Sequence, residues 1–404
     1  MPWKETNVLD SRLQFIALYQ QDIMSFSELC REFGISRTTG YKFIDRYSRD
    51  GPRGLEDMPR VAYSHPNATD ILVQQQIIDL RSQHPNWGPR KLRAILMRQF
   101  PDQPWPAAST IGEHLKTRGL VSSRRRRKAA ATPSYDLTKP DAPNGVWTAD
   151  FKGQFRLGNN DFCYPLTICD RYSRMLLRCQ ALPNTSAQLA KPVWIATFRE
   201  YGLPRVIRTD NGAPFASIAT GGISRLSAWW IRLGIFPERI APGKPQENGS
   251  HENMHRALKQ DVARNPRANF KLQQIANDKF LSDYNHLRPH EAIGMQVPAD
   301  LYVDSPRAYP LILPDLQYPS DYIVRQVRIN GDFKWHGNMV FVSEILTGEP
   351  IGLEQLDDQY WALYYGLVPL AILDDHKKHL VPSKAAAPKL KQLMKEAMDN
   401  TSKC

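Results

Sequence analysis

Three acidic residues stand where a carboxylate could do chemistry. Asp150 lies inside an apolar segment, 147–155, that predicts a strand, and an unpaired charge there would be costly. Asp210 directly follows the predicted strand 205–209, and Glu252 falls in the first turns of a predicted helix. Ligands of open α/β sheets bind at the carboxyl ends of strands, where Asp210 lies. Carboxylates from two strands and a helix could therefore converge on Mg²⁺ or Mn²⁺, because these cations prefer oxygen ligands.

Each of these residues, taken alone, also has an ordinary structural interpretation. Asp210 precedes an Asn-Gly pair and could simply belong to a turn. Glu247 lies shortly before Glu252 and competes with it for the same role. Asp170, which follows another predicted strand, is better explained by a turn or by an ion pair with a neighbouring arginine. The chemistry therefore depends on all three carboxylates meeting at one place.

The segment 144–300 must position these carboxylates. Apolar runs predict strands at 147–155, 163–169, 175–182 and 205–209, and amphipathic runs predict helices at 185–201, 226–233, from 249 onward and at 271–287. Strands in succession, followed by alternating helices and strands, are typical of an α/β domain with a mixed sheet. Asn184 is the expected cap of the first of these helices.

The N-terminal region predicts a helix-turn-helix. Ser25 and Glu28 form an S-x-x-E capping box that starts a short helix, and after a turn at Gly34, Ser36 can cap a second helix, 37–47. The second helix of such a motif enters the major groove with its N-terminus first. Its candidate DNA-binding residues are Arg37, Thr38, Thr39 and Lys42. An ordinary pair of packed helices with a solvated basic face is the alternative interpretation.

A second helical module follows, with predicted helices 71–83, 90–100 and 109–119. Its middle helix carries Arg90 and Lys91, which are candidate DNA contacts, although a structural bundle would explain them equally well. The next segment is a run of consecutive cations that cannot pack. It therefore predicts an exposed linker that could lie along a phosphate backbone. These cations are Arg124, Arg125, Arg126, Arg127 and Lys128.

The C-terminal part, 318–375, predicts short strands separated by turn signals such as Asn330-Gly331. Strands of this spacing predict a small β-barrel. From about residue 381 the chain is rich in Lys and Ala, which predicts a mobile or weakly helical tail.

Composition and charge limit the class of partner. The chain has 404 residues and a net charge of +12, of which +8 lies in residues 1–130, where 21 Lys and Arg oppose 13 Asp and Glu. This balance favours a polyanion such as nucleic acid. The sequence has no apolar run of the ~20 residues that a membrane span needs, no apolar segment of a secretory signal, and no CxxC pair among its five cysteines. We therefore expect a cytoplasmic protein with no membrane partner.

Several motifs, taken in chain order, resemble those of one family. They are Thr148-Ala149-Asp150-Phe151-Lys152-Gly153, Thr209-Asp210-Asn211-Gly212, Pro242-Gly243-Lys244-Pro245-Gln246-Glu247-Asn248-Gly249, Glu252, His255-Arg256-Ala257-Leu258-Lys259 and Tyr284-Asn285-x-x-Arg288-Pro289-His290. This ordered set resembles the integrase catalytic core of DDE transposases. It is most similar to the IS481-type bacterial insertion-sequence transposases, which are related to the IS3 group and to retroviral integrases. The segment 30–41 of the helix-turn-helix matches the same family.

The resemblance implies an RNase H-like core in which Asp150, Asp210 and Glu252 form the catalytic triad and hold two Mg²⁺ or Mn²⁺ ions per active site. In the family the acid follows the Asn-Gly pair, which selects Glu252 over Glu247. Forty-one residues separate Asp210 from Glu252, a long spacing that indicates an insertion at 216–226. Expected DNA contacts of the core are Lys152, Asn248, His255, Arg256 and Lys259, of which the last three share a helix face with Glu252 by their spacing.

The activity that the resemblance implies is transposition. The protein would bind transposon terminal repeats, hydrolyse the DNA at their ends, and join the 3′ hydroxyls to target DNA as at least a dimer. The alternatives are a catalytically silent, transposase-derived DNA-binding regulator and a stand-alone RNase H-like nuclease. The expected layout is a helix-turn-helix domain at 1–60, a second helical DNA-binding domain at 61–122, a basic linker at 123–143, the α/β catalytic core at 144–305, a small β-barrel at 306–378 and a basic tail at 379–404.

Overall fold

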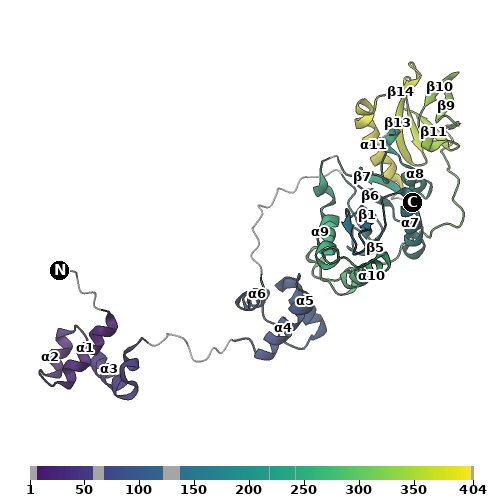
Figure 1. Ribbon diagram of the computed structural model, residues 1–404. Coiled ribbons are helices and arrows are strands. Elements are labelled where there is room, and N and C mark those ends of the chain that lie inside the picture. Colours follow the sequence, from purple (N-terminus) through teal and green to yellow (C-terminus); the bar gives the residue numbers. More distant parts are fainter. Residues whose placement is uncertain (1–6, 58–67, 122–136, 218, 242, 402–404) are drawn as a thin grey trace. The chain divides into compact units, whose positions relative to one another are not determined.

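The computed structural model describes residues 7–57, 68–121, 137–217, 219–241 and 243–401 (Figure 1). By their contacts the residues divide into two compact units, Met1–Thr69 and Asp70–Cys404. The run of cations at 124–128 lies outside the described residues. Within the described part of the chain, no helix is both long and apolar enough to cross a membrane.

The first unit is a helix-turn-helix bundle, as predicted. It contains α1 (Val8–Gln20), α2 (Phe26–Glu32) and α3 (Arg37–Asp50). The capping box at Ser25 is present, because its hydroxyl accepts from the Glu28 amide while the Glu28 carboxylate accepts from the Ser25 amide. The buried core of this unit is Phe15, Ile16, Leu29, Cys30 and Leu55.

The second unit begins with another helical module. Its helices are α4 (Ile71–Gln83), α5 (Pro89–Gln99) and α6 (Ala108–Thr117), which agree with the predicted helices to within two residues. A helix start at Pro89 is favourable, because proline already has a helical φ and its missing N–H would have no partner there. Ile77, Leu92 and Ile111, one from each helix, are buried together in the core of the module.

A mixed sheet forms the centre of the second unit, as predicted. Its strands run in the order β5 (Leu176–Gln180), β4 (Leu166–Asp170), β1 (Val146–Phe151), β6 (Val206–Thr209) and β7 (Phe236–Arg239). β1 is antiparallel to β4 and parallel to β6. The predicted strands 147–155 and 163–169 are each interrupted. The end of the first and the start of the second pair with each other as a short hairpin of β2 (Phe155–Arg156) and β3 (Phe162–Cys163). Gly153, at φ 85°, turns the chain after β1.

Helices cover both faces of this sheet. On one face α7 (Ala187–Tyr201) and α8 (Arg225–Arg232) pack Trp194 and Trp229 against Trp147. On the other, α9 (Gly249–Leu258) and α10 (Phe270–His286) pack Met254 and Phe280 against β4 and β5. The cap of α7 is Ser186, not the predicted Asn184, whose side chain instead accepts from the Ser186 amide.

The C-terminal strands form a half-barrel. They lie in the antiparallel order β14 (His379–Leu380), β13 (Val368–Asp374), β12 (Tyr360–Tyr365), β11 (Pro350–Gln355) and β8 (Ile323–Gln326). β9 (Asp332–Trp335) and β10 (Asn338–Phe341) pair separately, with the hairpin turn at His336-Gly337. Asn330-Gly331 therefore connects strands of two different sheets, whereas the sequence predicts a hairpin there.

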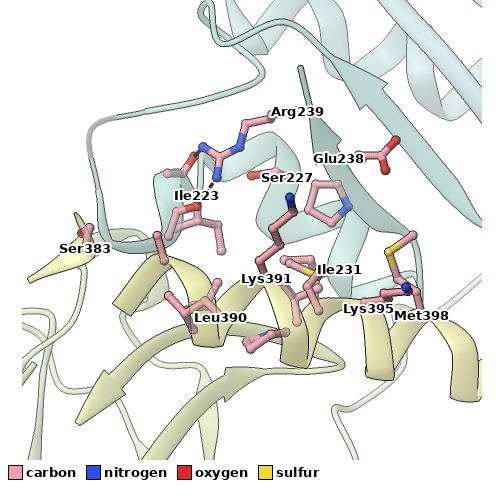
Figure 2. Close-up of a pocket in the computed structure, with 18 of the residues that line it drawn as sticks. Ile223, Ser227, Ile231, Glu238, Arg239, Ser383, Leu390, Lys391, Lys395 and Met398 are labelled. Atoms are coloured by element: carbon pink, nitrogen blue, oxygen red, sulfur yellow. Dashed lines mark hydrogen bonds between the residues drawn. The ribbon is translucent and has the colours of Figure 1, made fainter. Parts of the chain in front are cut away.

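The C-terminal tail is helical, which is one of the two predicted alternatives. Residues Ser383–Thr401 form the helix α11, whose Ala386 and Leu393 are buried against the half-barrel. Figure 2 shows α11 facing the central sheet, with Leu390 and Met398 on one side of a cavity and Ile231 and Glu238 on the other. The cavity measures about 1500 Å³. Apolar residues at helical spacing among the lysines explain why this basic segment packs as a helix.

Candidate active site

The pairing of β1 with β6 brings the first two carboxylates together. In this parallel pair Thr148 lies opposite Arg208. Asp150 and Asp210 each lie two residues further along the chain, so they stand side by side at the carboxyl ends of neighbouring strands. The Gly212 amide donates to Asp210 Oδ1 at 3.0 Å, which fixes the Asp210 side chain at the turn.

Glu252 reaches the same place from α9. A cavity of about 490 Å³ is lined by the first acid, the helix and the segment after β1: Asp150, Phe151, Lys152, Gly153, Glu252, His255, Arg256 and Lys259. The residues predicted to share a helix face with Glu252 therefore line one wall. Among them Arg256 and Lys259 are exposed, so cations are available beside the carboxylates.

The pKa of Asp150 is raised by its burial and by the neighbouring acids. Burial, and after it the charge on Asp210, raises the pKa of Asp150 to about 7, and the charge on Glu252 acts in the same direction. Burial and the nearby Lys259 lower the pKa of Lys152. Negative charges gathered around a buried carboxyl group are favourable only with a cation or a proton between them.

The donors are those of a hard divalent cation. Three carboxylates supply only oxygen ligands, which suit Mg²⁺ or Mn²⁺ better than softer metals. In the described residues, however, no group of three or more His, Cys, Asp or Glu side chains is arranged to hold a metal ion. The chemistry of the donors thus fits such an ion, while the side chains do not form a closed set of ligands.

Glu247 and Asn248 belong to the turn that precedes α9, and Glu247 lines the larger cavity at α11. Glu247 is buried, and its Oε2 accepts from the Ala241 amide at 2.7 Å. Its carboxylate therefore holds a loop. Asn248 is also only 4% exposed. A side chain so buried does not reach a DNA strand, so the predicted DNA contact at Asn248 has no support in this structure.

Two buried histidines of α9 form a polar network that the sequence analysis did not detect. His251 and His255 both lie within hydrogen-bond distance of Thr167, and His251 also contacts Thr148. Both are buried, and His255 also lies with its Nδ1 3.8 Å from Asp150 Oδ2. Its ring is held against the strands, so the predicted DNA contact at His255 has no support in this structure. Histidines four residues apart on one helix, and threonines within otherwise apolar strands, were the available signals.

The predicted DNA-reading residues of α3 lie at its N-terminus. Arg37, Thr38 and Lys42 are exposed, and the Arg37 guanidinium also contacts the Ser27 hydroxyl. Thr39 is half-buried and serves the cap, because its hydroxyl lies 2.9 Å from that of Ser36. Of the four residues predicted to contact DNA, Arg37, Thr38 and Lys42 are therefore the exposed ones.

Two basic residues of α5 form ion pairs with acidic residues C-terminal to α10, although the arginine side chains stay largely exposed. Arg98 donates both of its terminal nitrogens to the Asp300 carboxylate, at 2.8 and 3.1 Å. Arg90 lies 3.5 Å from Glu291. Burial, and after it the charge on Arg288, lowers the pKa of Lys91 to about 8. These contacts do not support the predicted role of Lys91 in DNA binding.

Comparison with known proteins agrees with this geometry. Residues 140–245 match the family model described as "Integrase core domain", and residues 233–298 match a second model with the same description. Residues 140–298, which hold the mixed sheet and its helices, are thus similar to integrase cores. N-terminal to it, residues 11–60 match "Helix-turn-helix domain" and residues 39–115 match "Homeodomain-like domain".

Individual relatives of the integrase core are distant. An uncharacterized 39.2 kDa protein of insertion element IS476 from Xanthomonas euvesicatoria is 27% identical, over 61% of this chain and 69% of that protein. The Gag-Pol polyprotein of baboon endogenous virus is 26% identical over 48% of this chain, and the match covers only 11% of the polyprotein. A structure of the HTLV-2 integrase catalytic core domain in complex with magnesium is 15% identical, covers 40% of this chain and 97% of that one, and has a TM-score of 0.30.

Proposed function

We propose that this chain is the transposase of a bacterial insertion sequence, of the IS481 type. The observation that carries the proposal is the β1–β6 register, which sets Asp150 beside Asp210 at the edge of the integrase core where Glu252 arrives from α9. The reaction would be cleavage of DNA at the ends of the element, followed by joining of the 3′ hydroxyls to target DNA.

Each group of side chains has a distinct task in this reaction. Asp150, Asp210 and Glu252 would hold two Mg²⁺ or Mn²⁺ ions. Bound divalent cations supply polarisation of the scissile phosphate and activation of the attacking hydroxyl group. Lys152, Arg256 and Lys259 line the same cavity and would hold the phosphates of the DNA strands. The helix-turn-helix would select the terminal repeats, and the protein would act in the cytoplasm on the nucleoid.

Two ends must be cut and joined in concert, so the active species would be at least a dimer on DNA. The alternative, a catalytically silent DNA-binding regulator, has no need of two further carboxylates beside the half-buried Asp150. A stand-alone nuclease would not need the N-terminal helical modules.

The test uses the full chain, DNA that carries the element's own ends, and Mg²⁺ or Mn²⁺. A transposase cleaves at the ends and transfers them to a second DNA, and the Asp150→Asn variant does neither. Binding without cleavage would favour the regulator, and cleavage of any DNA without joining would favour the nuclease. Sedimentation of the DNA complex measures the oligomer, and a fully active monomer would refute the dimer.

A further inference from the structure

Four buried polar side chains connect the two elements that carry Asp150 and Glu252. Thr148 lies on β1, two residues before Asp150, and Thr167 of β4 lies directly opposite Asp150 in the antiparallel register. His251 and His255 flank Glu252 on α9. Within the described residues, these contacts join the strand of one acid to the helix of the other.

The hydrogen atoms of this network can be assigned from its contacts. The Thr167 hydroxyl donates to the Asp150 backbone carbonyl at 2.9 Å, which uses its only proton. The Nε2 atoms of His251 and His255, at 2.8 and 2.7 Å from Thr167 Oγ1, must therefore donate to it. His251 Nδ1 is then the acceptor for the Thr148 hydroxyl at 2.8 Å. The Thr148 hydroxyl also lies 3.5 Å from the Cys169 carbonyl, but His251 Nδ1, at the shorter distance, is the stronger acceptor for its proton.

The Thr167 hydroxyl is the centre of this arrangement. It contacts the backbone of Asp150 on one side and both histidines of α9 on the other. Thr148, Thr167, His251 and His255 are all buried, and hydrogen bonds away from water are both stronger and more costly to leave unmade. Alternative placements of α9 along the sheet would break several of these bonds together.

We infer that the Thr148–His251–Thr167–His255 network is a positioning device that sets the distance between the Asp150 and Glu252 carboxylates. This inference rests on the proposed function, because it concerns the same carboxylates. Residues that orient metal ligands in this way typically change metal affinity or activity by roughly 10- to 100-fold when they are replaced.

Thr167 offers a matched pair of substitutions. Thr167→Val keeps the shape of the side chain and removes the hydroxyl, whereas Thr167→Ser keeps the hydroxyl. Thr197 of α7 is an equally buried threonine whose hydroxyl donates to Val193 and accepts from Arg178, so Thr197→Val removes a comparable hydroxyl far along the chain from the site. Together the three variants distinguish the general effect of removing a buried hydroxyl from the specific effect of removing the Thr167 hydroxyl.

The readout is the rise in Tm of the full-length protein when Mg²⁺ is added, measured with Mn²⁺ in parallel. Mg²⁺ demands near-ideal octahedral geometry, so a loosened site should lose Mg²⁺ response first. We expect Thr167→Val to raise the half-saturating Mg²⁺ concentration by roughly 10- to 100-fold, while Thr167→Ser and Thr197→Val retain the wild-type response. A lower metal-free Tm with an unchanged Mg²⁺ response would overturn the inference, because the hydroxyl would then only stabilise the fold.

A second variant covers the case in which Thr167→Val does not fold. Thr148→Val removes the contact to His251 Nδ1 and a long, weak contact of 3.5 Å to the Cys169 carbonyl, but leaves the Thr167 hydroxyl in place. A smaller shift in the same direction is therefore expected, and no shift would count against the network. The metal response is read without DNA. A wild-type protein that binds Mg²⁺ but never cuts DNA would therefore refute the proposed activity while leaving the test of the network intact.

Discussion

At the scale of single residues, Asp150 is a carboxyl group in an environment that disfavours its charge. It is half-buried, and two other acids lie close enough to raise its pKa. A protein that only needed a stable strand would place an apolar residue here. A cation bound among Asp150, Asp210 and Glu252 would neutralise their charges and so offset the free-energy cost of placing Asp150 here.

The triad can be tested by substitutions that keep shape and remove charge. Asp150→Asn, Asp210→Asn and Glu252→Gln should each reduce end cleavage and strand transfer by about 100-fold or more, because each removes a charged metal ligand. DNA binding, measured by a gel-shift assay, should persist. A variant that cleaves normally would exclude that residue from the triad.

Glu247 provides the control for this series. Its buried carboxylate accepts from the Ala241 amide, and the carbonyl oxygen of a glutamine can accept the same bond. Glu247→Gln should therefore retain substantial cleavage and joining activity in the same assay. If Glu247→Gln is inactive while Glu252→Gln cleaves normally, the two glutamates have been assigned in the wrong order.

The raised pKa of Asp150 also predicts a pH dependence of stability in metal-free protein. The ordinary pKa is 3.8 and the folded pKa is about 7, so between these values the folded state binds the proton more tightly than the unfolded state. The stabilisation is complete below pH 3.8 and is lost as the pH rises to about 7. In EDTA, the Tm of the wild type relative to Asp150→Asn should therefore fall between about pH 5 and about pH 7.5. A constant difference would contradict the assignment.

At the scale of elements, the polar N-terminus of α3 is the surface that we propose reads DNA. Arg37 is exposed there, and a good contact between arginine and a base pair is worth about 1–3 kcal/mol of discrimination. Arg37→Ala should therefore reduce preference for element ends over random DNA by roughly 5- to 150-fold, with little change in non-specific affinity. Competition binding with both DNAs measures this.

The contrasting change removes the cations at 124–128, which lie outside the described residues. Phosphate contacts carry no sequence information, so neutralising them should weaken binding to all DNA and reduce its salt dependence. If neutralising residues 124–128 relaxed the sequence preference, or if Arg37→Ala left it unaltered, the assignment of base reading to Arg37 and of phosphate binding to residues 124–128 would be wrong.

At the scale of the whole molecule, the inserted segment 216–226 connects two parts of the second unit. Its turn η2 (Thr220–Gly222) packs on β13, where a Cβ at Gly221 would come within 3.0 Å of Leu370. Arg239 of β7 donates to the carbonyls of Gly221 and Gly222 and so holds the turn from the core side (Figure 2). This segment between Asp210 and Glu252 thus contacts the half-barrel on one side and the central sheet on the other.

The helical module α4–α6 is held to the core by charge, which gives a further prediction. Asp300→Arg should repel Arg98 and reduce the protection of α5 from hydrogen exchange, and adding Arg98→Asp should restore it. The side chains are partly exposed, so the effect should be small, about 0.2–1 kcal/mol. Equal protection in all three proteins would mean that the pair contributes nothing to docking.

The sequence by itself determined most of the helices and singled out the three carboxylates that we propose to react. Caps such as Ser25 and Ser36 act within a few residues, so helix starts can be predicted locally. Asp150, Asp210 and Glu252 were distinguished by their neighbours along the chain. The mixed sheet followed from the order of apolar segments.

Only the tertiary structure decided how these pieces meet. The β1–β6 register, the burial of Glu247 and Asn248, and the attachment of the basic helices α5 and α11 all depend on residues far apart in the chain. The same holds for Thr167, which is an ordinary strand residue until β4 places it between Asp150 and two histidines. Local patterns cannot predict such contacts, because their free energy appears only when distant segments exclude water from one another.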